Sequence, residues 1–224
     1  MLGKSILTLF VIFISSVSLL AQKDDIGNWF IYFGNQGLSK KWNWHNEIQY
    51  RNYNFIGDMQ QLLIRTGIGY NLSDNNNNLL FGYGFIKTQN YIADTDEKRG
   101  FDEHRFFQQF ITRQHFERVY LQHRYRIEER IFDNDLQLRL RYFLAVNVPI
   151  TTKEMLESTI YASAYNEVFI NAQNNIFDRN RLYGAIGYVI DSNFKVELGF
   201  MAQTLENTNR NQFQIVIFNN LPLY

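Results

Sequence analysis

The sequence predicts an all-β protein: a transmembrane, antiparallel, up-and-down β-barrel of about 10–12 strands, preceded by a cleavable signal peptide. Three observations predict this fold. Apolar and polar residues alternate with a period of two along most of the chain. Many alternating segments are longer than the roughly 5–6 residues of an ordinary globular strand. The chain also begins with an apolar segment of the kind that directs export.

The first 21 residues differ from the rest of the chain. Lys4 supplies a positive start, and an apolar run follows it. Ala21 ends a plausible cleavage site before Gln22, although Leu19, three positions before the cleavage, is larger than the small residue preferred at that position. A membrane anchor is the competing interpretation, but the run is short and stops at a small residue. We therefore expect residues 1–21 to be a signal peptide and residues 22–224 to form a single β-barrel domain.

The overall composition excludes several classes of function. Twenty-two basic and 22 acidic residues argue against a nucleic-acid binder that works by neutralising phosphates. The absence of Cys excludes disulfides, thiolate metal sites, cysteine nucleophiles and a lipoprotein anchor. After Gln22 no apolar run approaches the roughly 20 residues of a transmembrane helix, so an exported chain of this kind is either soluble or spans a membrane with strands.

Eleven segments are expected to be strands, in chain order. The alternation is clearest in "WNWHNEIQYR", "QLLIRTGIGYNL", "LQLRLRYFLAVNV", "FKVELGF" and "QFQIVIF". The excess of aromatic residues suits strands, because flat side chains pack well on a pleated surface. The expected strands lie near residues 28–34, 42–54, 59–72, 78–91, 102–113, 117–132, 136–148, 157–171, 180–190, 194–204 and 211–221.

The number eleven conflicts with an antiparallel barrel whose two termini both lie in the periplasm, because such a barrel has an even number of strands. Either residues 28–34 are not a wall strand, which leaves ten, or one strand is missing, which gives twelve. The connections "GLSKK", "SDNNNN" and "DSN" are short, whereas "IADTDEKRG", "NAQNNIFD" and "LENTNRN" are longer. We expect short turns at one end of the barrel and long loops at the other, with the short "FDND" as an exception.

Alternation alone also fits a soluble β-sandwich or a lipocalin-like binding protein with its polar face in water. The membrane barrel is favoured because the polar faces carry groups that can pair across a closed lumen and the apolar faces carry large aromatics towards strand ends. The expected interface aromatics are Trp42, Trp44, Tyr70, Tyr83 and Tyr142. The expected lumen-lining residues are Glu47, Arg51, Arg65, Glu103, Arg105, Arg124, Arg126, Glu128, Arg130, Arg139, Arg141, Glu167, Arg181, Lys195 and Glu197.

Two residues fall on the expected lipid face although they are polar. Glu129 lies near a strand end, where a charge costs only about 0–1 kcal/mol. His123 lies nearer the middle, so it must stay neutral or find a partner. His104 and His115 are expected near strand ends, facing water or the rim.

Several stretches resemble, in order, the conserved segments of the domain of unknown function 2490 family. They are "WFIYFG", "LSKKWNWHNEIQYRNY", "EHRFFQQF", "HRYRIEER", "LRLRYFL", "NEVFIN" and "RNRLYGAIGYVI". The resemblance implies an outer-membrane β-barrel of the kind found in Bacteroidetes-type bacteria. The family has no established activity, so the resemblance implies a fold and a location without supplying a mechanism.

We do not expect the protein to be an enzyme. His45 and Glu47 are two apart on one strand face and could act as a base with its orienting carboxylate in a lipid-modifying enzyme, the alternative function. No serine can be placed beside them. The histidines are scattered without metal-ligand spacing, and no cofactor is expected.

The expected lumen residues include ten bases and five acids, an excess of five positive charges. The lumen is therefore either a structural filling or a narrow, anion-preferring channel. The expected location is the bacterial outer membrane, with outer-membrane lipid, the barrel-assembly machinery and small anionic solutes as partners. The end "FQIVIFNNLPLY" is similar to barrel assembly signals, although Pro222 is a departure.

Overall fold

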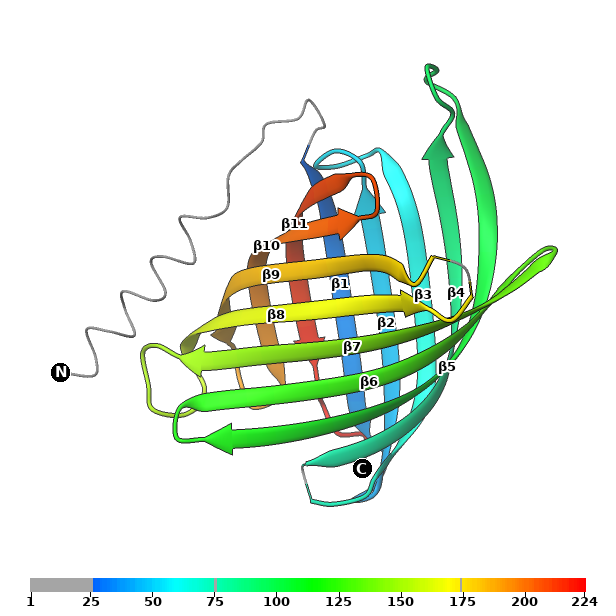
Figure 1. Ribbon diagram of the computed structural model, residues 1–224. Helices are drawn as coiled ribbons and strands as arrows, with labels where there is room; N and C mark the ends of the chain where they lie inside the picture. The colour runs from blue at the N-terminus through cyan, green and yellow to red at the C-terminus, as the bar shows by residue number, and fades with distance from the viewer. Residues whose placement is uncertain (1–25, 75, 174) are drawn as a thin grey trace.

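The computed structural model describes residues 26–74, 76–173 and 175–224. The predicted signal peptide, residues 1–21, lies outside the described residues. In the described part the chain is all-β and closes into a barrel of eleven strands (Figure 1). The prediction of an all-β barrel is confirmed. No helix among the described residues is long and apolar enough to cross a membrane.

The strands are between 11 and 19 residues long. Their bounds are β1 Gly27–Gly37, β2 Trp42–Asn52, β3 Met59–Asn71, β4 Asn77–Tyr91, β5 Lys98–Phe116, β6 Val119–Phe132, β7 Asp135–Pro149, β8 Ile160–Asn171, β9 Phe177–Val189, β10 Phe194–Leu205 and β11 Asn209–Asn219. Each lies beside its predecessor in sequence and pairs with it antiparallel, as an up-and-down barrel requires.

The barrel closes between the first and last strands, which run parallel. Gly27 pairs with Gln212 and Gly34 with Asn219 at the two ends of this seam. Residues 28–34 therefore belong to a wall strand. The expectation of ten or twelve strands was wrong, because it assumed antiparallel closure; a parallel seam lets an odd number of strands close a barrel.

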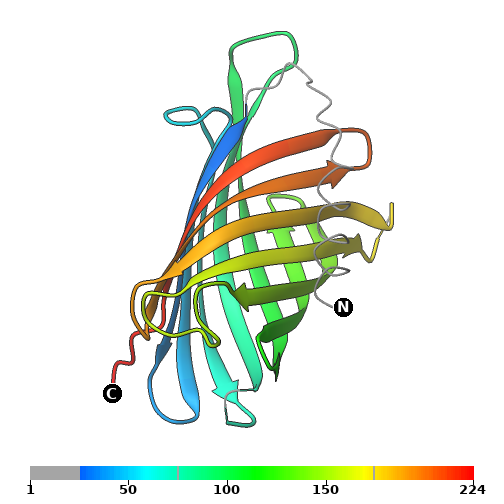
Figure 2. The same cartoon turned by 90° about the vertical axis from the view of Figure 1, so that its left-hand side faces the viewer.

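Consecutive strands join at alternate ends of the barrel, which we call the Ile26 end and the C-terminal end. The Ile26 end carries the connections β2–β3, β4–β5, β6–β7, β8–β9 and β10–β11, and the C-terminal end carries the others and residues 220–224 (Figure 2). The expected contrast between turns and loops is not observed, because the longest connection, residues 150–159, lies at the C-terminal end among short turns. Strand β8 accordingly begins at Ile160 rather than near residue 157.

The hairpin of β4 and β5 projects beyond the Ile26 end (Figures 1 and 2). Asp58, in the β2–β3 connection, accepts hydrogen bonds from Tyr91 (2.8 Å) and Lys98 at the base of this extension. Strand β5 starts at Lys98 rather than at residue 102, so His104 lies within the wall instead of near a strand end. The side chain of His104 is on the outer face, where its Nδ1 lies 2.6 Å from the Tyr83 hydroxyl.

Glycines on the inner face of the wall make room for aromatic rings. A Cβ at Gly187 would overlap the ring of Tyr161, and one at Gly199 would overlap the ring of Tyr183. Both tyrosines are buried inside the barrel. These two glycines are thus sites of close packing between a ring and the backbone of a neighbouring strand.

Candidate functional site: the charged barrel interior

The alternation of each strand sends one set of side chains into the barrel. In β6 the even positions Arg124, Arg126 and Glu128 point inward, while Tyr125 and Ile127 point outward and are exposed. All fifteen residues expected to line the lumen lie on inward faces. Arg124, Arg130 and Lys195 are half-buried, and the other twelve are buried.

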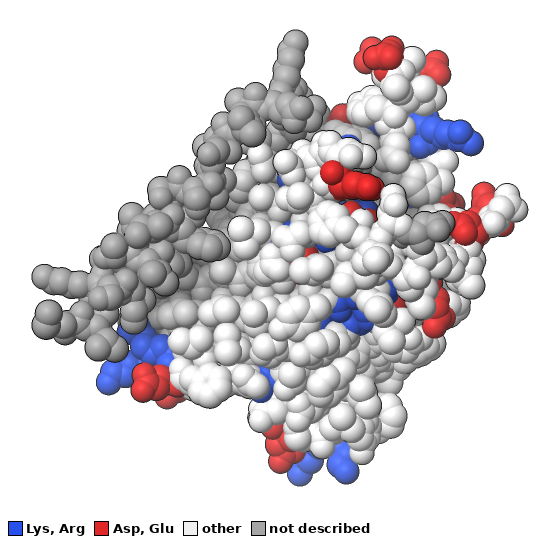
Figure 3. Space-filling model, viewed as in Figure 1, with Lys and Arg blue, Asp and Glu red and all other residues white. Residues whose placement is uncertain are grey.

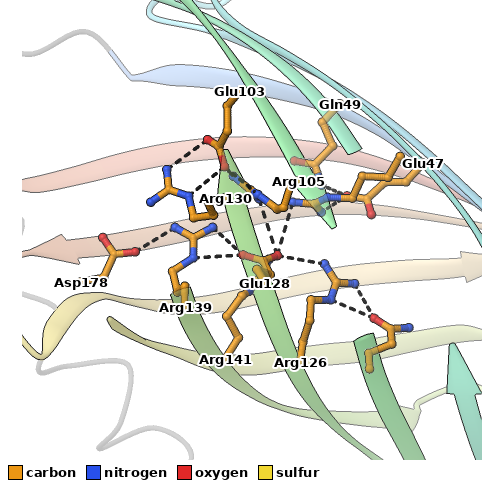
Figure 4. A network of polar contacts seen from close by, with 12 residues as sticks. Glu47, Gln49, Glu103, Arg105, Arg126, Glu128, Arg130, Arg139, Arg141 and Asp178 are labelled. Carbon is orange, nitrogen blue, oxygen red and sulfur yellow. Dashed lines mark hydrogen bonds and ion pairs between the residues drawn. The ribbon is translucent and has the colours of Figure 1, made fainter. Parts of the chain in front are cut away.

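Glu128 is the centre of the interior (Figure 4). Its carboxylate lies 2.6 Å from Arg139 and 2.5 Å from Arg141, both on the neighbouring strand β7. Three further guanidinium groups approach it from β6, β5 and β3, namely Arg126 at 3.5 Å, Arg105 at 3.6 Å and Arg65 at 3.9 Å. One fully buried carboxylate thereby compensates charge from four strands.

Three other carboxylates extend this network around the wall. Glu167 on β8 lies 2.6 Å from Arg124 and 2.6 Å from Arg141. Glu103 on β5 lies 2.5 Å from Arg105 and 2.8 Å from Arg130. Glu47 on β2 accepts a hydrogen bond of 2.8 Å from Arg65. The arginines thus connect the carboxylates, and each forked guanidinium can hold two acceptors at once.

The middle of the barrel is filled. Glu128, Phe107 and Met201 are all 0 % exposed, and Leu63 is 1 % exposed. A barrel of about eight strands is filled by its own side chains. Eleven strands enclose more space, and here long arginines and aromatic rings occupy it. The side chains at the level of Glu128 are therefore closed to solvent.

Above this filled level a cavity of about 290 Å³ lies at the Ile26 end, which we call the vestibule. Glu103 is the carboxylate on its wall among the described residues, and Trp29, Phe101 and Phe169 are its aromatic residues. Its arginines are Arg51, Arg65, Arg105, Arg130, Arg139, Arg141, Arg179, Arg181 and Arg210. The vestibule wall is therefore rich in arginine, and basic groups outnumber acidic ones on it.

The sequence analysis missed several inward residues. Arg179 and Arg210 line the vestibule, and Arg113 lies further along β5, where it donates a hydrogen bond of 3.1 Å to Gln122. Each lies an even number of positions from an inward residue of its own strand. Extending the alternation to the strand ends would therefore have found them. Trp29 gave no such signal, because "NWFIYFG" is apolar on both faces.

The five expected interface aromatics lie on the outer face. Trp42 and Tyr70 pack against each other edge to face near the C-terminal end, with ring centroids 4.9 Å apart. Tyr83 and Tyr142, in contrast, lie in the middle of β4 and β7, which corrects their expected position towards strand ends. Tyr142 is the partner of His123, whose Nδ1 lies 2.9 Å from its hydroxyl.

The His45 and Glu47 pair is present but has no nucleophile beside it. His45 Nε2 lies 3.5 Å from Glu47 Oε2. The residues paired with His45 on the adjacent strands are Asn35 and Gly67, neither of which carries a hydroxyl. The described residues also contain no group of three or more His, Asp or Glu that could hold a metal ion.

Comparison with known proteins decides the family. Residues 26–214 match the family described as "Protein of unknown function (DUF2490)". The chain belongs to the DUF2490 family. The match covers ten of the strands completely and about half of β11, so the resemblance seen in the sequence is confirmed. No curated protein and no solved structure matches this DUF2490 chain.

Proposed function

We propose that this DUF2490 barrel is an outer-membrane protein whose vestibule takes up small anions and whose Glu128 network keeps the barrel closed to free diffusion. The observation that carries the proposal is the lining of the vestibule, which holds nine arginines and one carboxylate, that of Glu103. Seven of these arginines pair with carboxylates, and among the described residues Arg51 and Arg210 have none within 4 Å. Arginine-lined cavities favour anions, because guanidinium groups attract negative charge and bind oxyanions with paired hydrogen bonds.

The outer surface supports placement in a membrane. Its strands expose large apolar side chains along their length, which a soluble barrel would bury in its interior. Figure 3 shows charged side chains gathered mainly at the ends of hairpins, with a largely uncharged wall between them. Examples of such exposed residues are Ile64, Phe81, Tyr125, Ile186 and Leu198. A polar interior inside an apolar wall is the arrangement of outer-membrane barrels.

The location is tested by placing a charge on the outer wall. Ile64→Arg should destabilise the barrel in phospholipid bilayers by about 2–4 kcal/mol, because the guanidinium would face lipid near mid-strand. The matched control is Ile176→Arg, in the β8–β9 connection, which should change stability by less than about 0.5 kcal/mol. Urea titration in bilayers measures both. Equal stability of the two variants, or recovery of the native protein in the soluble periplasm, would contradict a membrane location.

Closure and anion preference are tested in planar bilayers. The wild-type barrel should give no steady conductance. Phe107→Ala combined with Arg126→Ala removes two large buried side chains at the level of Glu128 and should open a path that prefers chloride to potassium. Free conductance of the wild type would refute closure, and a preference for potassium in the widened barrel would refute the anion preference.

A further inference from the structure

One part of the vestibule wall, around Trp29, has the arrangement expected of a binding site for a charged group. Two guanidinium groups lie over the indole ring of Trp29, that of Arg51 at 3.8 Å from the ring centroid and that of Arg181 at 5.0 Å. They come from β2 and β9, while Trp29 lies on β1. All three side chains are buried.

Neutral amides hold these arginines in place. Arg51 donates hydrogen bonds to Gln49 and, at 2.6 Å, to Gln61. Arg181 donates one of 2.8 Å to Gln203. An amide oxygen orients a guanidinium without cancelling its charge, so the two cations are fixed in direction and remain positive.

The positive charge at this point is only partly compensated by acids. Among the described residues no carboxylate oxygen lies within 4 Å of Arg51, and the closest one to Arg181 is that of Glu167 at 3.8 Å. A buried guanidinium group without a carboxylate partner is costly, because it loses its hydration and gains no opposite charge. Arg51, Arg181 and Trp29 all line the vestibule, and an anion bound there beside the two guanidinium groups would reduce this cost.

A second observation points to a missing acceptor. The indole Nε1–H of Trp29 is buried and makes no hydrogen bond with any described residue. An indole N–H is a donor only, so it is satisfied by an acceptor. An oxyanion would supply that acceptor together with the negative charge.

We propose that Arg51, Arg181 and Trp29 form a binding site for the phosphate group of a small soluble phosphorylated compound. This rests on the proposed function, since it names the class of anion that the vestibule takes up. A phosphate carries up to two charges in a compact tetrahedron, and its oxygens can meet donors from different strands at once.

The test measures binding of inorganic pyrophosphate to the refolded full barrel in a neutral sugar detergent without phospholipid. Isothermal titration calorimetry should find saturable binding by the wild type. Arg51→Gln and Arg181→Gln should each weaken it between about tenfold and a hundredfold, the loss expected for a hydrogen bond between charged groups. Trp29→Phe should weaken it less, because only one neutral donor is removed.

Lys195→Gln is the matched control, since it removes an inward positive charge at the C-terminal end and should leave pyrophosphate affinity unchanged. Heat-modifiable migration in detergent gels verifies that each variant is folded. Absence of saturable heat in the wild type, or equal affinity in all folded variants, would overturn the proposal. Displacement of pyrophosphate by added phosphatidylglycerol would assign the site to a lipid headgroup and overturn the soluble source.

The two proposals fail separately. A widened barrel that prefers anions together with a wild type that does not bind pyrophosphate would leave the proposed function standing and refute the phosphate site alone. A preference for cations in the widened barrel would refute the proposed function itself.

Discussion

Glu128 is the residue on which the interior charge depends most. Its carboxylate is 0 % exposed and faces arginines from β3, β5, β6 and β7. A buried ion pair is weak evidence for stability as such, because desolvation offsets its attraction. Removing one partner is different, since the remaining charges stay buried without compensation.

We therefore predict that Glu128→Gln destabilises the barrel by about 3–5 kcal/mol, the loss typical of breaking a buried pair. Urea unfolding in bilayers measures the change. The matched control is Glu129→Gln on the outer face of the same strand, which should alter stability by no more than about 1 kcal/mol. Equal effects of the two substitutions would mean that the Glu128 network does not hold the interior together.

The inward position of single residues followed from the sequence, but their partners did not. Arg124, Arg126 and Glu128 share one face because side chains in a strand alternate, which is a local property. The approach of Arg65 to Glu128 depends on two strands that are separated by β4 and β5. The spacing of residues along the chain does not predict the distance between Arg65 and Glu128.

At the scale of elements, aromatic rings of one strand pack against glycine residues of the neighbouring strand. Tyr161 on β8 covers Gly187 on β9, to which it is directly paired, and donates a hydrogen bond of 2.9 Å to Glu197 on β10. The tyrosine thus contacts both of the next two strands. A side chain at Gly187 would displace its ring.

Gly187→Ala should destabilise the barrel by about 1–3 kcal/mol, the usual cost of adding a methyl group to a filled site. Gly184→Ala is its control on the same strand, because a Cβ there meets no atom within 4 Å. Thermal or urea unfolding of both variants provides the comparison. If Gly187→Ala were as stable as Gly184→Ala, the ring of Tyr161 would not be seated against the backbone of β9.

The strands themselves were largely predictable, and their exact ends were not. The alternation in "WNWHNEIQYR" and "FKVELGF" located β2 and β10 closely. The extension of β5 back to Lys98 was missed because its polar residues are typical of a loop. Pairing with β4 supplies the backbone hydrogen bonds that keep these residues extended. The late start of β8 has a different cause, since the residues before Ile160 are outside the continuous pairing register with β7 and β9, although Ser158 and Thr159 still form backbone hydrogen bonds with Val189.

For the whole molecule, the parallel seam between β1 and β11 determines where the two termini lie. Strand β1 starts at the Ile26 end, whereas β11 finishes at the opposite end. A barrel with an even number of antiparallel strands places both termini on the same side. An odd number with a parallel seam separates them.

If the barrel spans the outer membrane as we propose, epitope tags placed directly ahead of Ile26 and after Tyr224 should lie on its opposite faces. Antibody labelling of intact cells should detect one tag, and permeabilised cells should show both. Detection of both tags on intact cells, or of neither, would contradict the parallel seam.

The sequence by itself determined that the fold is all-β and which side chains of each strand share a face, and it favoured a barrel with a basic interior over a soluble sandwich. These properties follow from a two-residue period that each strand carries within itself. Only the tertiary structure decided that eleven strands close through a parallel seam, that Glu128 lies near arginines from four strands, and that Arg51 and Arg181 both approach the ring of Trp29. These features join residues far apart in the chain, and their geometry arises only when strand register and barrel closure are set together.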